Sequence, residues 1–157
     1  MARQFELFFP NRDVLATAEL LEDLAPRTCQ LFWEQLPLAE ETYHTRRSGC
    51  ELFVITPPWP ALPGAENASL FCEAGDIFWF YFLPGYPDAP LHLKSRGLRD
   101  YVHLGFFYGR NSQPTGPYGP IAGNRFAVFR DNLEGFAAVA QKTRQEGYET
   151  LVLRRKG

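Results

Sequence analysis

The sequence is poor in residues on which several classes of protein depend. It has one methionine, three histidines and three cysteines in 157 residues. Cys29, Cys50 and Cys72 form no Cys-x-x-Cys pair, and their odd number suits neither a disulfide framework nor a zinc site. We therefore expect reduced, buried thiols.

Long apolar runs and clusters of positive charge are also missing. Apolar runs such as residues 77–83 have the length of a strand and are too short to cross a membrane. The first residues contain no apolar signal core, and the net charge is −2 with no basic run longer than residues 154–156. These features predict a soluble cytoplasmic protein that binds neither nucleic acid nor membrane.

Aromatic residues, in contrast, are abundant. Fourteen phenylalanines, seven tyrosines and three tryptophans favour pleated sheet, because flat side chains pack well on a half-buried strand face. The length suits one core, and no repeat, low-complexity tract or linker divides the chain. We expect a single domain over residues 1–157.

Two periodicities predict the secondary structure. Cys29, Phe32, Trp33 and Leu36 have the spacing of one buried helix face, and a second helix is expected between Asp131 or Asn132 and Gly147. Residues 114–123 are too rich in proline and glycine for regular structure. Strands are expected at residues 5–9, 14–21, 77–83, 101–108, 126–129 and 150–153, with two more in residues 41–56 that turn at Ser48 and Gly49. The expected fold is mainly β, a barrel plugged by two short helices.

Six short motifs follow one another along nearly the whole chain. They are Ala-Pro-Arg-Thr-Cys at 25–29, His-Thr-Arg-Arg-Ser-Gly at 44–49, Glu-Asn-Ala-Ser at 66–69, Gly-Asp-Ile at 75–77, Phe-Tyr-Gly at 107–109 and Ala-Gly-Asn-Arg-Phe-Ala at 122–127. Their order resembles the cyclophilin-like superfamily, and within it a family of small bacterial proteins of unknown function to which the opine-forming cucumopine synthase is distantly related. The resemblance implies a cyclophilin-like barrel. The Phe-Met-x-Gln-Gly-Gly signature of prolyl isomerases of that superfamily is absent, which disfavours prolyl isomerisation.

His44 and Arg46 are two residues apart on an expected strand, so both side chains should point to one face. A histidine exchanges protons near neutral pH, and an arginine binds a carboxylate through two parallel hydrogen bonds. Together they would suit a small acidic metabolite. Alternatively, both lie on a solvated face, or Arg46 pairs with a nearby glutamate.

Three more side chains are candidates for the same site. Glu51 alternates with Phe53 and Ile55, so a buried face would desolvate its carboxylate and suit it to act as a general base. The alternative is an exposed glutamate, or a partner of a neighbouring arginine. Tyr108 and Asn124 are further candidates for binding the substrate, although tyrosine in an aromatic strand is usually a packing residue.

No metal or cofactor is expected. His92 and His103 could join His44 and Glu51 around a metal, but their spacing matches no ligand motif. The sequence contains no P-loop, dinucleotide-binding glycine pattern or Gly-x-Ser-x-Gly elbow. Cys50 next to the hairpin glycine is either a nucleophile or a small packing residue.

These residues predict a cofactor-independent enzyme that acts on a carboxylate- or amine-bearing, amino-acid-like metabolite at one barrel mouth. His44 and Glu51 would be the acid and base, Arg46 the carboxylate anchor, and Tyr108 and Asn124 further contacts. The resemblance to cucumopine synthase implies carbonyl–amine condensation with cyclisation, a lyase or synthase reaction. The alternative is a non-catalytic ligand- or peptide-binding module, and in either case we expect a homo-oligomer.

Overall fold

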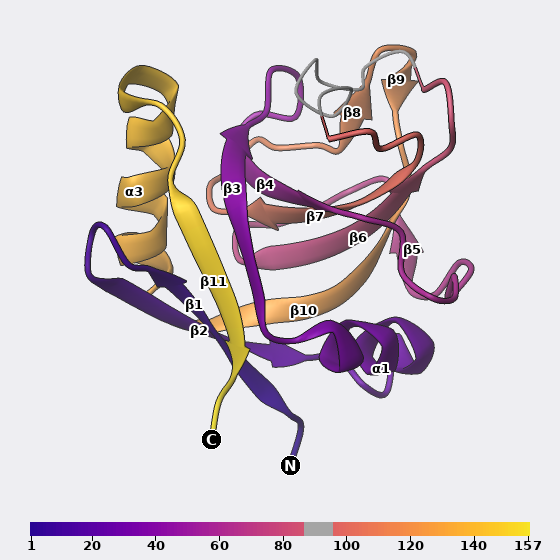
Figure 1. Cartoon of the computed structure of the whole chain (residues 1–157), viewed down its shortest axis with the longest axis horizontal. Helices are drawn as coiled ribbons and strands as arrows, with labels where there is room; N and C mark the ends of the chain where they lie inside the picture. The colour runs from indigo at the N-terminus through magenta and orange to yellow at the C-terminus, as the bar shows by residue number, and fades with distance from the viewer. Residues whose placement is uncertain (87–95) are drawn as a thin grey trace.

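The computed structural model describes residues 1–86 and 96–157 (Figure 1). Its helices are α1 (Pro26–Gln35) and α3 (Leu133–Glu146). Its strands are β1 (Gln4–Phe9), β2 (Val14–Leu20), β3 (Leu38–His44), β4 (Glu51–Thr56), β5 (Ala68–Ser69), β6 (Asp76–Phe82), β7 (Tyr101–Phe107), β8 (Thr115–Gly116), β9 (Gly119–Pro120), β10 (Gly123–Asp131) and β11 (Thr150–Arg155). Within these ranges, no helix has both the length and the apolar character needed to cross a membrane.

The long strands form a closed barrel. Their order is β2-β1-β11-β3-β4-β7-β6-β10, and β10 pairs with β2 to close the ring, with every pairing antiparallel. The part of the chain that the structure describes is therefore mainly β, an eight-stranded barrel with two helices. This confirms the expected fold class and is consistent with a cyclophilin-like barrel. Strand β4 is central, as the bulk on both of its faces predicted.

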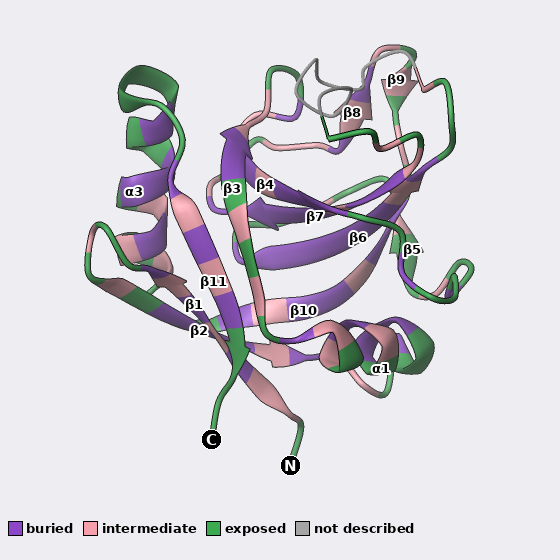
Figure 2. Ribbon diagram, in the orientation of Figure 1, coloured by how far each residue is buried: buried purple, intermediate pink, exposed green. Residues whose placement is uncertain are grey.

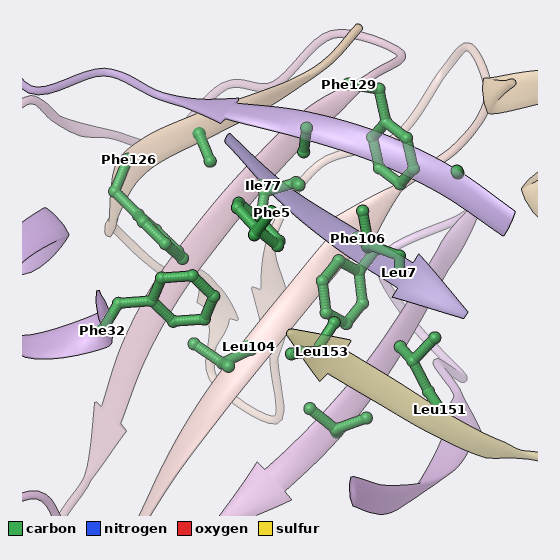
Figure 3. Close-up of a cluster of buried hydrophobic side chains, with 14 of the residues drawn as sticks. Phe5, Leu7, Phe32, Ile77, Leu104, Phe106, Phe126, Phe129, Leu151 and Leu153 are labelled. Carbon is green, nitrogen blue, oxygen red and sulfur yellow. The ribbon is translucent and has the colours of Figure 1, made fainter. Parts of the chain in front are cut away.

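The barrel interior is packed with apolar side chains. Phe5, Leu7, Leu104 and Phe106 point toward one another in Figure 3, and all are at most 1% exposed. Because alternate residues of a strand face opposite sides, the neighbours of each inward residue lie on the outer face of the barrel.

The two helices cover opposite ends of this interior. The ring of Phe32 on α1 lies 4.8 Å from that of Phe5 at the start of β1. The ring of Phe136 on α3 lies 5.1 Å from that of Phe9, where β1 ends. The Asn132 side chain begins α3 by accepting a hydrogen bond from the Gly135 amide, the capping role expected for this position.

Three local expectations are corrected. Strand β3 ends at His44, because the Thr45 hydroxyl accepts the backbone N–H groups of Arg47 and Ser48 in a side-chain turn. Arg46 consequently lies in a loop and not on the strand. Residues 114–123 contain the paired short strands β8 and β9, and β10 is longer than the expected strand at 126–129.

Candidate functional site

A cavity of about 600 Å³ lies against the outer face of β4, β7 and β6. Its size is typical of small-molecule sites. Strands β6 and β7 are buried along nearly their whole length in Figure 2, because the barrel core covers one face and surrounding loops cover the other. The lining residues are Tyr43, His44, Thr45, Arg46, Arg47, Ser48, Glu51, Phe53, Ile55, Phe80, Phe82, Tyr86, Tyr101, His103, Pro114, Thr115, Gly116, Ile121 and Tyr148.

This position corrects the expectation of a pocket at a barrel mouth. On β4, Leu52 and Val54 belong to the interior core, so Glu51, Phe53 and Ile55 point to the outer face. The barrel ends are occupied by the two helices. The loop after β3 and the segment containing β8 and β9 rise above the outer face in Figure 1 and form the cavity walls.

A glutamate and a histidine meet on the cavity floor. Glu51 is only 3% exposed, and its Oε2 lies 2.9 Å from Nε2 of His103 on the neighbouring strand. Among the described residues, neither Glu51 Oε1 nor His103 Nδ1 has a hydrogen-bond partner. The pair thus keeps one carboxylate oxygen and one ring nitrogen unused, and both residues border the cavity.

Aromatic rings fix the orientation of His103. The Phe53 ring stacks on the imidazole with centroids 4.3 Å apart and planes 14° apart. Phe80 and Phe82 meet it edge-on at 5.2 and 5.6 Å. Because these rings already fix the plane of the imidazole, the hydrogen bond from His103 Nε2 to Glu51 costs little further side-chain entropy.

His44 belongs to a different network at the cavity wall. Its Nδ1 lies 2.9 Å from the Thr45 carbonyl oxygen and its Nε2 lies 2.6 Å from the Tyr108 hydroxyl. Because a carbonyl oxygen only accepts, Nδ1 carries the proton of the neutral ring and Nε2 accepts the Tyr108 O–H. Arg144 of α3 places its Nε 3.2 Å from each ring nitrogen.

The surroundings of His44 favour its neutral form. Burial lowers the pKa of His44 below its ordinary value, and the positive charge of Arg144 acts in the same direction. The bond to the Thr45 carbonyl and the charge of Glu51 oppose this change without reversing it. Burial also raises the pKa of Tyr108, so its hydroxyl keeps the proton that it donates to His44.

Arg46 and Asn124 lie in different surroundings. Arg46 is exposed and lines the cavity together with Arg47, so positive charge borders one wall. Asn124 is buried outside the cavity lining, where Oδ1 accepts the Glu66 amide and Nδ2 donates to the Gly64 carbonyl and the Thr28 hydroxyl. Its three bonds hold the segment before β5 against β10 and α1.

The structure brings His44, Arg46 and Glu51 to one cavity, with Tyr108 behind His44, and places Asn124 elsewhere. The spacing of the histidines indicated His103 only as a candidate metal ligand. Over the described residues no group of three or more His, Cys, Asp or Glu could hold a metal, and His92 lies outside them. Cys50 packs beside the core and is not among the lining residues.

Fold and cavity together define a closed antiparallel β-barrel with a small-molecule-sized pocket on its outer face. The chain belongs to the DUF3830 family, described as a protein of unknown function, whose model matches residues 7–154. Comparison with curated proteins gives no match.

Solved structures that share the fold include the following two. One is McbB in complex with tryptophan, at 16% identity and a TM-score of 0.66, with 98% of this chain and 45% of that chain covered. The other is the solution structure of the hypothetical protein AF2241 from Archaeoglobus fulgidus, at 18% identity and a TM-score of 0.53, with coverage of 99% and 95%. This chain thus spans less than half of the McbB chain. The likeness to cucumopine synthase stays a prediction.

Proposed function

We propose that the protein binds a small amino-acid-like metabolite in the outer-face cavity and transforms it by acid–base catalysis. The observation that carries this proposal is the Glu51–His103 pair at the cavity, a buried carboxylate bonded to an imidazole, whose second oxygen has no hydrogen-bond partner among residues 1–86 and 96–157. Positioned carboxylates and imidazoles are the usual groups that accept and return protons in active sites.

The proposed reaction is a carbonyl–amine condensation followed by cyclisation. The amine nitrogen attacks the carbonyl carbon, a water molecule leaves, and an imine forms. A carbon of the same molecule then attacks the imine carbon, the imine nitrogen gains a proton, and the attacking carbon loses its own proton to a base, so that water is the only molecule released. Glu51 Oε1 is suited to take a proton from the attacking amine and return it to the leaving hydroxyl, and then to take the proton of the attacking carbon. The ring N–H of His103 stabilises the carboxylate whenever Glu51 is deprotonated.

His44 and Arg46 have supporting roles in this proposal. His44 is the second acid–base candidate, with Tyr108 acting through it by donating to Nε2. Arg46 at the cavity wall would bind the carboxylate of the metabolite by paired hydrogen bonds. Asn124 lies outside the cavity lining, and we assign it no contact with the ligand.

The apolar part of the cavity favours a ligand with a ring. Phe53, Phe80 and Phe82 line the floor, and further lining tyrosines stand at the sides. Aromatic side chains pack edge-on or offset against a planar ring and bury a large area. A structural neighbour in complex with tryptophan makes an aromatic amino acid the first ligand to test.

The experiment pairs single L-amino acids with 2-oxo acids or aldehydes in the presence of purified protein. Mass spectrometry then searches for products whose mass is the sum of both reactants minus one water. We expect Glu51→Gln to abolish product formation, because an amide is a poor base, and exposed Glu34→Gln to leave it unchanged. Equal product from wild type and Glu51→Gln would refute acid–base catalysis by Glu51.

The same experiment separates the alternative function. Calorimetric binding of L-tryptophan without any condensation product from the reactant panel would favour a non-catalytic binding module. The three free thiols, Cys29, Cys50 and Cys72, support our further proposal of a cytoplasmic location, since reducing compartments preserve thiols. We also propose a homo-oligomer, which sedimentation would test.

A further inference from the structure

Gly105 lies on the cavity side of β7, between the two members of the Glu51–His103 pair. In the strand register Glu51 is opposite Phe107 and Ile55 is opposite His103, so Gly105 is the same-face position between them. Positions 103 and 107 are four steps apart along the strand, a distance of about 13 Å. The Glu51 and His103 side chains must therefore meet above Gly105.

The Glu51 carboxylate occupies the space of the side chain that Gly105 lacks. A Cβ atom built at Gly105 would lie 2.2 Å from Glu51 Oε2 and 3.2 Å from Glu51 Cδ. Its next neighbour, Cε2 of Phe107, would be 3.4 Å away, which is ordinary contact. Even one methyl group at this position would thus collide with the oxygen that bonds His103.

The backbone gives no other reason for glycine here. The Gly105 φ angle is outside the left-handed region, and its pairing with Phe53 on β4 and Phe78 on β6 is free of register shifts. Glycine inside a regular strand is unfavourable, because it restricts a flexible backbone and contributes no side chain to packing. The required feature is the empty space.

We propose that Gly105 is a positioning residue for acid–base chemistry, and that its missing side chain makes the bond between Glu51 and His103 sterically possible. This inference rests on the proposed function of the pair. Without that space the carboxylate must turn away from His103. Turnover should then fall by about 10²-fold, the scale of loss that follows a misplacement of about 1 Å.

The first test needs no substrate. Nitrogen-15 NMR of the histidine side chains reports the Nε2–H of His103 bonded to a carboxylate, and His103→Gln assigns the signal. We expect Gly105→Ala to abolish this bonded signal, while the signals of His44 stay in place. A bonded His103 signal that persists in folded Gly105→Ala would overturn the proposal.

The second test distinguishes the carboxylate from general packing. We expect Gly105→Ala to lower the melting temperature of the wild type but to leave that of the Glu51→Ala protein unchanged or higher, because no carboxylate then meets the new methyl group. An equal loss in both backgrounds would overturn the proposal. If Gly105→Ala alone does not fold, a folded Glu51→Ala/Gly105→Ala protein supports it and an unfolded one refutes it.

These measurements fail independently of the proposed function. Loss of the His103 signal in Gly105→Ala together with absence of any condensation product would leave the positioning role intact and remove the catalytic one. If the wild type forms product and Gly105→Ala forms it equally well, the positioning role is refuted and the proposed catalytic function stands. A loss of turnover that appears in kcat with substrate binding unchanged would identify a defect in the catalytic pair.

Discussion

Replacing His103 by phenylalanine should cost the protein much of its stability. The new ring can keep the stack on Phe53 and the edge contacts in the aromatic cluster, but it offers no donor to Glu51 Oε2. Glu51 would then be a buried carboxylate without a hydrogen-bond partner among the described residues. The substitution therefore measures the contribution of the hydrogen bond to stability, because the volume of the side chain is nearly preserved.

The magnitude follows from the burial of the pair. Leaving a buried polar group without its hydrogen-bond partner costs about 1–3 kcal/mol, and more when that group is a carboxylate. Glu51 borders a cavity, where water can solvate part of the carboxylate. We therefore expect His103→Phe to lower the free energy of unfolding by about 2–4 kcal/mol at pH 7.

Urea unfolding gives this free energy, and a double variant supplies the control. His103→Phe/Glu51→Leu removes the donor and the charge together, so we expect its stability to lie within about 1 kcal/mol of wild type. A small cost of the single variant, below about 1 kcal/mol, would show that Glu51 does not depend on His103. A double variant as unstable as the single one would refute the same reasoning.

Three further outcomes are expected from the same cavity and its surroundings. The pKa of His44 is lowered on folding, so below about pH 6.5 the unfolded chain takes up more protons than the folded one and the free energy of unfolding should fall. Between pH 7 and 5 the melting temperature should therefore fall less for His44→Gln than for the wild type. Arg46→Gln should weaken the binding of a carboxylate ligand such as L-tryptophan by about tenfold or more, with the melting temperature unchanged. Arg110→Gln, outside the cavity lining, should leave this affinity unchanged. Asn124→Ala should lower the free energy of unfolding by about 2–4 kcal/mol, because three hydrogen bonds are lost in a buried setting, and an unchanged urea midpoint would contradict this.

The fold was predictable because its signals are local. The helix spacing that begins at Cys29 and the turn residues around Asn132 each depend on neighbours within a few positions. The alternation after Glu51 likewise predicted β4 and its two buried faces. The end of β3 was misplaced because the Thr45 hydroxyl forms a turn that strand periodicity does not reveal.

The site was predictable only in part. Alternation along β4 gave Glu51 as a residue whose burial would matter, but its partner His103 is 52 positions away in the sequence. Cross-strand register decides that contact, and no local pattern specifies which residue of β7 is opposite Ile55. Gly105 between two apolar residues was the available signal, since a glycine within a strand often marks a close approach.

Packing explains why the cavity lies outside the barrel. An eight-stranded barrel has an interior that side chains can fill, and here phenylalanines such as Phe5 and Phe106 fill it while α1 and α3 cover its ends. A ligand of the size of the cavity has no room inside. Loops rise around the outer face of β4, β7 and β6 and enclose a cavity against it. The side chains that face this cavity belong to the strand positions that alternate with the core positions. The same alternation that fills the interior therefore places Glu51 and His103 on the outer face, and the space above Gly105 lets them meet.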